Sequence, residues 1–237
     1  MILAWLECTP ILRQSIESLM LDWNEIDTVL LDMDGTLLDL HYDNYFWLQH
    51  LPKRYAEMKC ISESEAKTFL EQFFHDLKGT LNWYCFDHWA ELLDVDMVSL
   101  KHEVKHKIAF RPHAQTFLKL IADAHYKVAL VTNSHRAGVE IKLQCTNLGD
   151  YIDEVHTSHD FGLPKEDPVF WQELHKVLPY DPKRTVFFDD NEDVLLSAKN
   201  AGLIHLVNIA QPDSQRAPRV DSQFPLLDSF LDILPNP

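Results

Sequence analysis

The sequence predicts an α/β fold: a three-layer, Rossmann-like core with a parallel sheet, and a small α-helical cap inserted after the first strand. Short, mostly apolar runs alternate with helical patterns in the later part of the chain, which is typical of a parallel sheet with helices on both faces. Between Asp39 and Arg111 this alternation stops, and only helical patterns occur. At 237 residues the chain is long enough for a core domain that carries such an insertion.

Five runs have the composition of strands that are buried on both faces of a sheet. They are mostly apolar without a regular polar alternation, as expected where helices cover both faces. Residues 153–158 fit this description least well, because DEVHTS is largely polar. The expected strands cover residues 27–32, 127–132, 153–158, 185–190 and 204–209.

Helical patterns separate the later strands. The last of them ends at Gly202, a residue type favoured just after a helix C-terminus. Thr9 and Pro10 open a further amphipathic pattern near the N-terminus, although Met20 is an alternative start of the chain. The expected helices cover residues 10–20, 136–147, 167–178 and 192–202.

The insertion after the first strand contains its own helix signals. Ser62 and Glu65 form a capping-box pattern at the start of a helix that Gly79 ends. Two more helical patterns follow, at residues 87–93 and 98–108. We therefore expect a core domain of residues 1–39 and 108–237 and a helical cap of residues 40–107.

Charge narrows the range of functions. Lys and Arg number 21 and Asp and Glu number 37, so the formal net charge is −16. Such a field repels nucleic-acid phosphates, and no basic stripe offsets it. An anionic substrate therefore needs a local reversal of the field, which a metal ion and a well-placed lysine supply.

The distribution of apolar residues and thiols predicts a cytoplasmic protein. No apolar run approaches the roughly 20 residues needed to cross a bilayer. The N-terminus has no basic leader before its apolar part, which argues against a signal peptide. The thiols are scattered without a CxxC pair, so we expect neither a disulfide framework nor zinc. They belong to Cys8, Cys60, Cys85 and Cys145.

Polar side chains stand at the carboxyl ends of three expected strands, the edge at which open parallel sheets bind ligands. Carboxylate-rich ends form a hard-oxygen site suited to Mg²⁺, and a lysine and a hydroxyl nearby complete a cradle for a phosphoryl group. Asp34–Gly35 between apolar runs also has a structural alternative, since it is a hairpin-turn signal. The strand-end residues are Asp32, Asp34, Thr132, Asn133, Asp189 and Asp190, with Lys165 just before a later helix.

The residue types at these positions suit phosphoryl transfer. A carboxylate such as Asp32 can attack phosphorus and form an aspartyl-phosphate, which splits hydrolysis into two easier steps. Asp34 can protonate the leaving oxygen and then take a proton from water. Mg²⁺ between Asp32 and Asp189 would let two anions approach each other, and Lys165 adds a fixed positive charge.

The complete set of motifs resembles the haloacid-dehalogenase superfamily of phosphohydrolases over residues 27–210. TVLLDMDGTL is similar to its first motif, LVTNS to its second and FFDDNEDVLLSAKNAG to its fourth, while Lys165 matches the third. The resemblance implies Mg²⁺ as the cofactor and a small α-helical cap after the first motif. It implies catalytic roles for Asp32, Asp34, Thr132 and Lys165, metal binding by Asp32, Asp34 and Asp189, and supporting positions around the metal for Asp190 and Asp193.

The resemblance extends to a narrower branch. DTVLLDMDGTLLDL, DNYFW, TLNWYC and FGLPKEDP are similar to the bacterial GMP/IMP 5′-nucleotidases, which prefer purine nucleoside monophosphates. Glu166 departs from the wider superfamily, where proline often follows the lysine. Asp34 favours phosphoester chemistry, because an alkoxide leaving group needs a proton and a halide does not. A phosphatase of sugar phosphates or other small phosphometabolites, and a phosphomutase, stay open as alternatives.

Aromatic side chains of the insertion are candidates for substrate binding, because purine rings stack on aromatic faces. Aromatic residues at helical spacing are more often core residues, so we expect most of them to pack within the cap. Residues with polar groups or near helix ends are the better candidates, and Asn133 at a strand end joins them. This group comprises Asn44, Tyr45, Trp47, Trp83, Tyr84 and Asn133.

Two other functional classes compete with a phosphatase. His102, Glu103 and His106 match the HExxH pattern of zinc peptidases, but the pattern lies in a charged segment with little apolar flank and no evident third ligand. A catalytically silent binding protein would be expected to have lost the carboxylates or the lysine, and all are present. We expect the protein to bind a small phosphomonoester and neither nucleic acid nor a membrane. The sequence leaves the oligomeric state open, and a monomer is compatible with it.

Overall fold

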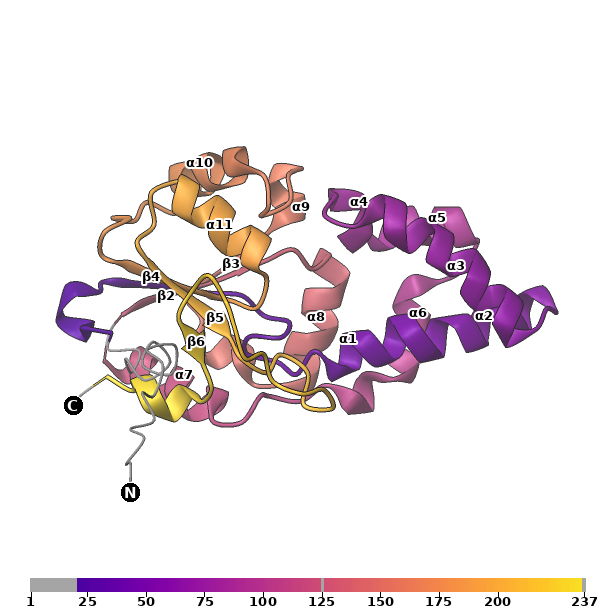
Figure 1. Ribbon diagram of the computed structural model, residues 1–237, viewed down its shortest axis with the longest axis horizontal. Coiled ribbons are helices and arrows are strands. Elements are labelled where there is room, and N and C mark those ends of the chain that lie inside the picture. The colour runs from indigo at the N-terminus through magenta and orange to yellow at the C-terminus, as the bar shows by residue number, and fades with distance from the viewer. Residues whose placement is uncertain (1–20, 125, 236–237) are drawn as a thin grey trace, which may run out of the picture.

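Six parallel strands form the central sheet in a computed structural model that describes residues 21–124 and 126–235. The strand order is β3-β2-β1-β4-β5-β6, so β1 lies inside the sheet (Figure 1). The five expected strands are confirmed, whereas the two-residue β6 was missed, and the helix expected over residues 10–20 lies outside the described residues. The strands are β1 (Thr28–Leu31), β2 (Lys127–Thr132), β3 (Glu154–Thr157), β4 (Thr185–Asp189), β5 (His205–Ile209) and β6 (Leu226–Leu227).

The register of β1 determines where its carboxyl end lies. Leu31 is opposite Leu130 of β2 and Phe188 of β4, and both neighbouring strands run parallel to β1. Asp32, the next residue, therefore stands level with the ends of both neighbours. The hairpin alternative for Asp34–Gly35 is wrong, because a hairpin would give β1 an antiparallel neighbour.

Gly35 makes the turn that leads out of β1. Its φ is +88°, a conformation that residues with a Cβ rarely adopt. A Cβ at this position would also lie 2.7 Å from Cγ of Asp190. The turn therefore needs glycine both for its backbone conformation and for the close approach to Asp190.

Helices cover both faces of the sheet because alternate strand residues point to opposite sides. Val29 and Leu31 belong to the apolar cluster that includes α7 (Ala114–Asp123) and α8 (Arg136–Cys145). Leu30 belongs to the opposite cluster, which includes α10 (Pro168–Val177) and α11 (Glu192–Asn200). Figure 1 shows α10 and α11 on one side of the strands and α7 on the other. The helices expected between the later strands are thus confirmed.

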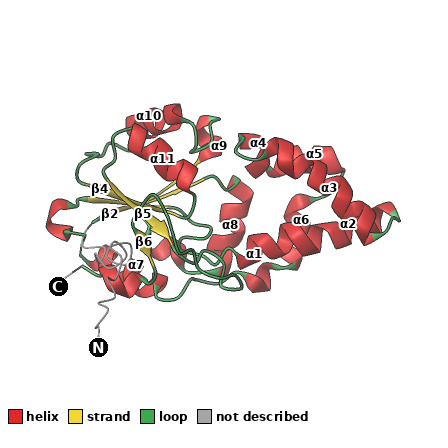
Figure 2. Cartoon of the chain, in the orientation of Figure 1, coloured by secondary structure: helices red, strands yellow, loops and turns green. Residues whose placement is uncertain are grey.

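A helical segment follows β1 and lies to one side of the sheet (Figures 1 and 2). All of residues 41–107 are described and none lies in a strand. The segment has an apolar cluster of its own, with Phe46 and Trp89 fully buried in it. The predicted domain division at residues 40 and 107 stays a prediction. The elements are α1 (His41–Tyr45), the π-helix η3 (Phe46–His50), α2 (Leu51–Lys59), α3 (Glu63–Leu77), α4 (Leu81–Tyr84), α5 (Phe86–Leu93), α6 (Met97–Glu103) and the 3₁₀ helix η4 (Lys105–Lys107).

Two of the helices predicted in this segment, α3 and α5, form close to the expected residues, whereas the pattern at residues 98–108 divides into α6 and η4. The elements α1, η3, α2 and α4 were not predicted. The capping box of α3 is confirmed: Ser62 Oγ accepts a hydrogen bond from Glu65 N, and Ser62 N donates to Glu65 Oε2. The helix ends just before Gly79, whose φ is +78°. In the described parts of the chain no helix is both long enough and apolar enough to pass through a membrane.

Candidate active site

A cavity of about 820 Å³ lies where the carboxyl ends of β1, β2 and β4 face the helical segment. Its volume suits a small molecule. The sheet side contributes Asp32, Asp34, Thr132, Asn133, Lys165, Asp189, Asp190 and Asp193, and the helical segment contributes Asp43, Asn44, Trp47, Trp83, Tyr84 and Lys101. The cavity thus brings together all but one of the residues predicted for a phosphatase site.

Lys165 joins the carboxylates at the ends of β1 and β4. Its Nζ donates to Asp32 Oδ1 at 2.6 Å, to Asp189 Oδ2 at 2.7 Å and to the carbonyl oxygen of Val131 at 3.0 Å. The side chains of Lys165, Asp32 and Asp189 are all buried. Trp171 of α10 donates from Nε1 to the carbonyl oxygen of Lys165 at 3.0 Å, which fixes the loop that carries the lysine.

Burial governs the protonation of these groups. It raises the pKa of Asp32 to about 6, an effect that Lys165 opposes and Asp189 reinforces. Burial alone would lower the pKa of Lys165, but Asp189 and Asp32 outweigh it, so this pKa lies above its ordinary value. Burial likewise raises the pKa of Asp34 to about 6 against the charge of Lys142. A carboxyl group with a pKa close to neutral suits general acid–base catalysis.

Three carboxylates beside Lys165 form a candidate metal centre. One oxygen from each of Asp32, Asp189 and Asp190 lies within 4.8 Å of the others. Carboxylate oxygens are the ligands that Mg²⁺ prefers, so these residues fit the expected cofactor. Arg219 supports Asp190 by donating from Nη1 to its backbone carbonyl oxygen at 2.5 Å.

Two other predicted metal-site residues lie outside this group of three carboxylates. The carboxylate of Asp34 instead pairs with Lys142. Asp193 lies in the first turn of α11, is exposed, and lines the cavity without joining the group. The structure thus brings Asp190 together with the two central carboxylates, and leaves the side chains of Asp34 and Asp193 farther from them.

A network of buried charges holds Asp34. Lys142 Nζ on α8 lies 2.6 Å from Asp34 Oδ1 and 2.9 Å from Asp43 Oδ2. Asp43 on α1 also accepts a hydrogen bond from Lys101 Nζ on α6, at 2.7 Å. Asp43 and Lys101 belong to the helical segment, whereas Asp34 and Lys142 belong to the sheet side. The network therefore ties the candidate acid to the position of the helical segment.

The sequence motifs did not reveal Lys142 or Lys101, but a signal for both exists. Each lysine is buried on a helix whose other buried positions are mostly apolar: Val139 and Ile141 beside Lys142, and Leu100 beside Lys101. A charge on an apolar helix face is costly unless it has a partner. Such a position therefore indicates that a carboxylate lies opposite, without saying which one.

Asn133 links the second strand end to the loop of Lys165. Its Oδ1 accepts from Lys165 N at 2.8 Å, and its Nδ2 donates to Glu166 Oε2 at 2.9 Å. The other carboxylate oxygen of Glu166 accepts from Tyr84 OH at 2.8 Å and from Asn191 Nδ2 at 3.3 Å. Glu166, the departure from the wider superfamily pattern, thus joins the helical segment to the sheet.

Thr132 and two tryptophans present groups toward the cavity. Thr132 Oγ1 accepts from Ser134 N at 3.0 Å, so its hydroxyl hydrogen is available to a bound oxygen. The rings of Trp47 and Trp83 stack 6.0 Å apart, with 20° between their planes. Asn44 lines the same cavity but donates from Nδ2 to Asp213 Oδ2 at 2.6 Å.

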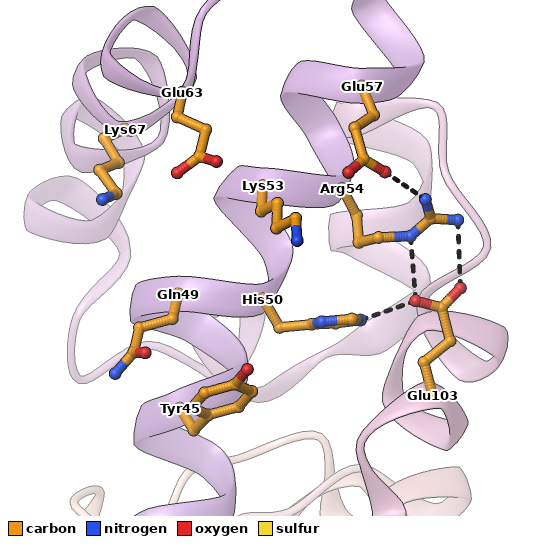
Figure 3. A pocket seen from close by; sticks show the side chains of 9 residues that line it. All are labelled: Tyr45, Gln49, His50, Lys53, Arg54, Glu57, Glu63, Lys67 and Glu103. Atoms are coloured by element: carbon orange, nitrogen blue, oxygen red, sulfur yellow. Dashed lines mark hydrogen bonds and ion pairs between the residues drawn. The ribbon is translucent and has the colours of Figure 1, made fainter.

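Tyr45 is the predicted substrate-binding residue that the structure places elsewhere. It lines a second cavity, of about 580 Å³, on the helical segment (Figure 3). The Tyr45 ring lies beside Lys107, whose Nζ is 4.0 Å from the ring centroid. The structure thus separates Tyr45 from the other substrate-binding candidates, and its role in substrate binding stays a prediction.

The HExxH alternative fails on the geometry of its segment. Helix α6 ends at Glu103, and His106 lies in the separate 3₁₀ helix η4. Glu103 accepts from Arg54 and His50, as Figure 3 shows, so its carboxylate is already engaged. Neither His102 nor His106 belongs to a group of metal-binding side chains among the described residues.

Known proteins are similar to this chain in sequence or in fold. The chain is 35% identical over 214 residues to the GMP/IMP nucleotidase YrfG of Escherichia coli (strain K12), covering 90% of this chain and 96% of that protein. It is 26% identical over 189 residues to the pyrophosphatase PpaX of Bacillus cereus (strain G9842), covering 75% and 80%. The crystal structure of a HAD phosphatase from Thermococcus onnurineus matches with a TM-score of 0.68 and 26% identity, over 78% of this chain and 86% of that one.

A family profile agrees with these relatives. The profile describes haloacid dehalogenase-like hydrolases and matches residues 29–207, which include every predicted catalytic residue. The match begins in β1 and ends in β5, so it spans the sheet and the helical segment together. The chain therefore belongs to the haloacid dehalogenase-like hydrolase family.

Proposed function

We propose that this haloacid dehalogenase-like phosphatase is a Mg²⁺-dependent 5′-nucleotidase that hydrolyses purine nucleoside monophosphates, GMP and IMP among them, in the cytoplasm. One observation carries the proposal: the carboxylates, the lysine and the threonine of a phosphatase site line the same cavity as Trp47, Trp83 and Tyr84. The 35% identity to a GMP/IMP nucleotidase supports the choice of substrate.

In the first half-reaction Asp32 is the nucleophile. One of its carboxylate oxygens attacks phosphorus, the bond between phosphorus and O5′ breaks, and an aspartyl-phosphate forms. Asp34 donates a proton to the departing O5′, which leaves as the nucleoside hydroxyl. Lys165, which holds Asp32 at 2.6 Å, stabilises the negative charge of the phosphoryl oxygens, and the hydroxyl of Thr132 donates to one of them.

In the second half-reaction water attacks the phosphorus of the aspartyl-phosphate. Asp34, now ionised, takes a proton from that water, and inorganic phosphate leaves as the carboxylate of Asp32 is restored. Lys142 lies 2.6 Å from Asp34 and favours its ionised form, so the residue can alternate between acid and base.

Asp32, Asp189 and Asp190 would hold Mg²⁺, and a ligand role for Asp34 stays a prediction. The cation supplies positive charge that offsets the anionic phosphoryl group as it meets the carboxylates. The protein carries a net charge of −16, which repels an anionic substrate. Lysines near the site, such as Lys165, oppose this repulsion.

The helical segment would act as a cap that binds the base and excludes water. Trp47 and Trp83 offer aromatic surface for a purine, and stacking on such a surface contributes roughly 1–3 kcal/mol per base. Tyr84 joins the segment to Glu166 across the cavity. Closure of the segment would keep bulk water from the aspartyl-phosphate until the nucleoside has left.

A screen of nucleoside monophosphates and sugar phosphates in the presence of Mg²⁺ tests the proposal. We expect kcat/KM for GMP and IMP to exceed that for pyrimidine nucleotides and sugar phosphates by roughly tenfold or more, because only purines fill the aromatic part of the cavity. A preference for a sugar phosphate would refute the nucleotidase assignment and leave the phosphatase chemistry intact. Isomerisation of a sugar phosphate without release of phosphate would indicate a phosphomutase.

A further inference from the structure

Cys85, His135 and His159 meet at the junction between the helical segment and the sheet side. One ligand atom from each lies within 4.8 Å of the others. Cys85 stands between α4 and α5, His135 immediately precedes α8, and His159 lies in α9 (Ser158–Phe161). The scattered thiols predicted no zinc site, because the members of this group lie on separate elements and no spacing rule connects them.

The surroundings orient the two imidazoles. The rings of His135 and His159 lie 4.9 Å apart with their planes nearly perpendicular, at 81°. Phe86, the neighbour of Cys85, stacks on His135 with ring centroids 5.2 Å apart. The three ligand-bearing residues are all partly buried. They therefore form a defined group and not a chance meeting of mobile surface side chains.

His159 carries the clearest sign of a missing partner. Its Nε2 is buried and has no hydrogen-bond partner among the described residues. Buried polar atoms without a partner are rare, and each calls for an explanation. Burial and the neighbouring His135 lower the pKa of His159 to about 4.

We propose that Cys85, His135 and His159 form a second metal site, which takes a transition-metal ion such as Zn²⁺ through one thiolate and two imidazoles. Three protein ligands of these types, with a fourth position open, are a familiar zinc arrangement. The thiol of Cys85 gives up its proton on binding. His135 Nδ1 accepts a hydrogen bond from Ala137 N at 3.3 Å, and its Nε2 lies 3.5 Å from the exposed Asp87 Oδ2. A metal bond through Nε2 would move the ring proton to Nδ1 and replace both weak contacts.

This site would select a different metal from the carboxylate site. Thiolate and imidazole ligands favour Zn²⁺ or Co²⁺, whereas carboxylate oxygens favour Mg²⁺. The side chains of Asp32, Asp189 and Asp190 offer only oxygen ligands. We therefore expect Mg²⁺ at these carboxylates and a transition-metal ion at the thiol and the two imidazoles.

A metal ion at this place would fasten the helical segment to the sheet side. Cys85 belongs to the segment, whereas His135 follows Ser134, which lines the large cavity. A bound ion would therefore restrain the opening of the segment and slow turnover. This consequence rests on the proposed function, whereas metal binding itself does not.

Titration of the metal-free full-length protein with Co²⁺, in excess Mg²⁺, tests the site by absorption spectroscopy. We expect one equivalent of Co²⁺ to produce a sulfur-to-cobalt charge-transfer band, which a carboxylate site cannot produce. Cys85→Ser should abolish the band, and His159→Gln should weaken Co²⁺ binding by roughly tenfold or more. The matched controls Cys60→Ser and Cys145→Ser remove free thiols outside the group and should keep the band. Absence of the band in the unsubstituted protein, or its persistence in Cys85→Ser, would overturn the proposal.

Circular dichroism and hydrolysis of p-nitrophenyl phosphate with Mg²⁺ alone would show that each variant is folded. With Mg²⁺ in excess, added Zn²⁺ should slow the unsubstituted enzyme and have much less effect on Cys85→Ser. Equal inhibition of both proteins would refute the restraint on the helical segment. Because the cobalt spectrum needs no substrate, its result separates a failure of the metal site from a failure of the nucleotidase assignment.

Discussion

The ammonium nitrogen of Lys142 lies 2.6 Å from Oδ1 of Asp34, and both side chains are largely shielded from solvent. Lys142 also pairs with Asp43 of α1, at 2.9 Å. The candidate acid is therefore positioned by a lysine that itself depends on the helical segment. Displacement of the helical segment would change the surroundings of Asp34. Closure of the segment is therefore coupled to proton transfer by Asp34.

Replacement of Lys142 by methionine tests this positioning. Without the ammonium group, Asp34 loses its partner and its carboxylate is free to rotate away from the leaving oxygen. We expect kcat for a nucleoside monophosphate to fall by roughly 100-fold, the lower end of what general acid–base catalysis contributes. Rapid-mixing measurements of the first half-reaction should show a much smaller loss with p-nitrophenyl phosphate, whose leaving group departs without a proton.

Lys101→Met is the matched control, because it removes a buried lysine from the same network and leaves the contact between Lys142 and Asp34 in place. Both variants lose a buried ion pair, so thermal unfolding should show a similar loss of stability for each. Equal losses in the rate of the first half-reaction on the two substrates in Lys142→Met would contradict the positioning role.

Asp32→Asn should abolish turnover while the protein stays folded. The amide cannot attack phosphorus, but it can still accept a hydrogen bond from Lys165, which keeps its second partner Asp189 at 2.7 Å. Activity against p-nitrophenyl phosphate is the measurement, with circular dichroism as the check on folding. Near-normal hydrolysis by this variant would mean that another group is the nucleophile.

The sheet and its catalytic edge could be predicted from the sequence because both depend on local patterns. The strand that ends just before Asp32 is mostly apolar, and a parallel sheet delivers such ends to one edge. Lys165 could be included because it stands just before a recognisable helix start, with Asp167 as the N-cap. The strand β6 was not predicted, because two residues are too few to show the apolar pattern of a strand.

Contacts between elements could not be predicted in the same way. The pairing of Asp34 with Lys142 depends on how α8 packs against the turn after β1, and no sequence spacing encodes that packing. Tyr45 could not be assigned to the second cavity, because a helical pattern shows which residues share a face but not which face meets a cavity. Cys85 and His159 were not linked, since their proximity exists only after the segment has folded onto the sheet.

Removal of Mg²⁺ and a pair of aspartate variants test the metal centre. A chelator should silence the enzyme and added Mg²⁺ should restore it, because the carboxylates need a cation between them and the substrate. Asp190→Asn should raise the Mg²⁺ concentration needed for half-maximal activity by roughly tenfold or more. Asp193→Asn, in the same strand-to-helix region but outside the three-carboxylate group, should leave it nearly unchanged. A larger effect at Asp193 would argue for a different set of ligands.

Tyr84→Phe tests the contact between the helical segment and Glu166. The hydroxyl of Tyr84 donates to Glu166 at 2.8 Å, and its loss should weaken closure over the substrate. Hydrogen bonds to charged groups contribute about 1.5–3 kcal/mol, so kcat/KM for nucleoside monophosphates should fall roughly 10- to 100-fold. Tyr45→Phe is the control, since that tyrosine lines the other cavity, and its kinetics should match those of the unsubstituted enzyme. If the two substitutions lowered kcat/KM equally, the hydroxyl of Tyr84 would have no specific role in closing the helical segment over the substrate.

The neutral His159 should make stability depend on pH. Burial and His135 lower the pKa of His159 from 6.5 to about 4, so between these values the unfolded chain binds a proton that the folded protein does not. The free energy of unfolding therefore falls as the pH drops through this window, and the loss is complete below the folded pKa. His159→Gln removes this titration, so urea unfolding of the metal-free protein should show a shallower decline for the variant. His75→Gln, at a side chain that is 93% exposed, should decline as steeply as the unsubstituted protein. Identical slopes for His159→Gln and the unsubstituted protein would mean that His159 takes up its proton equally in the folded and unfolded states.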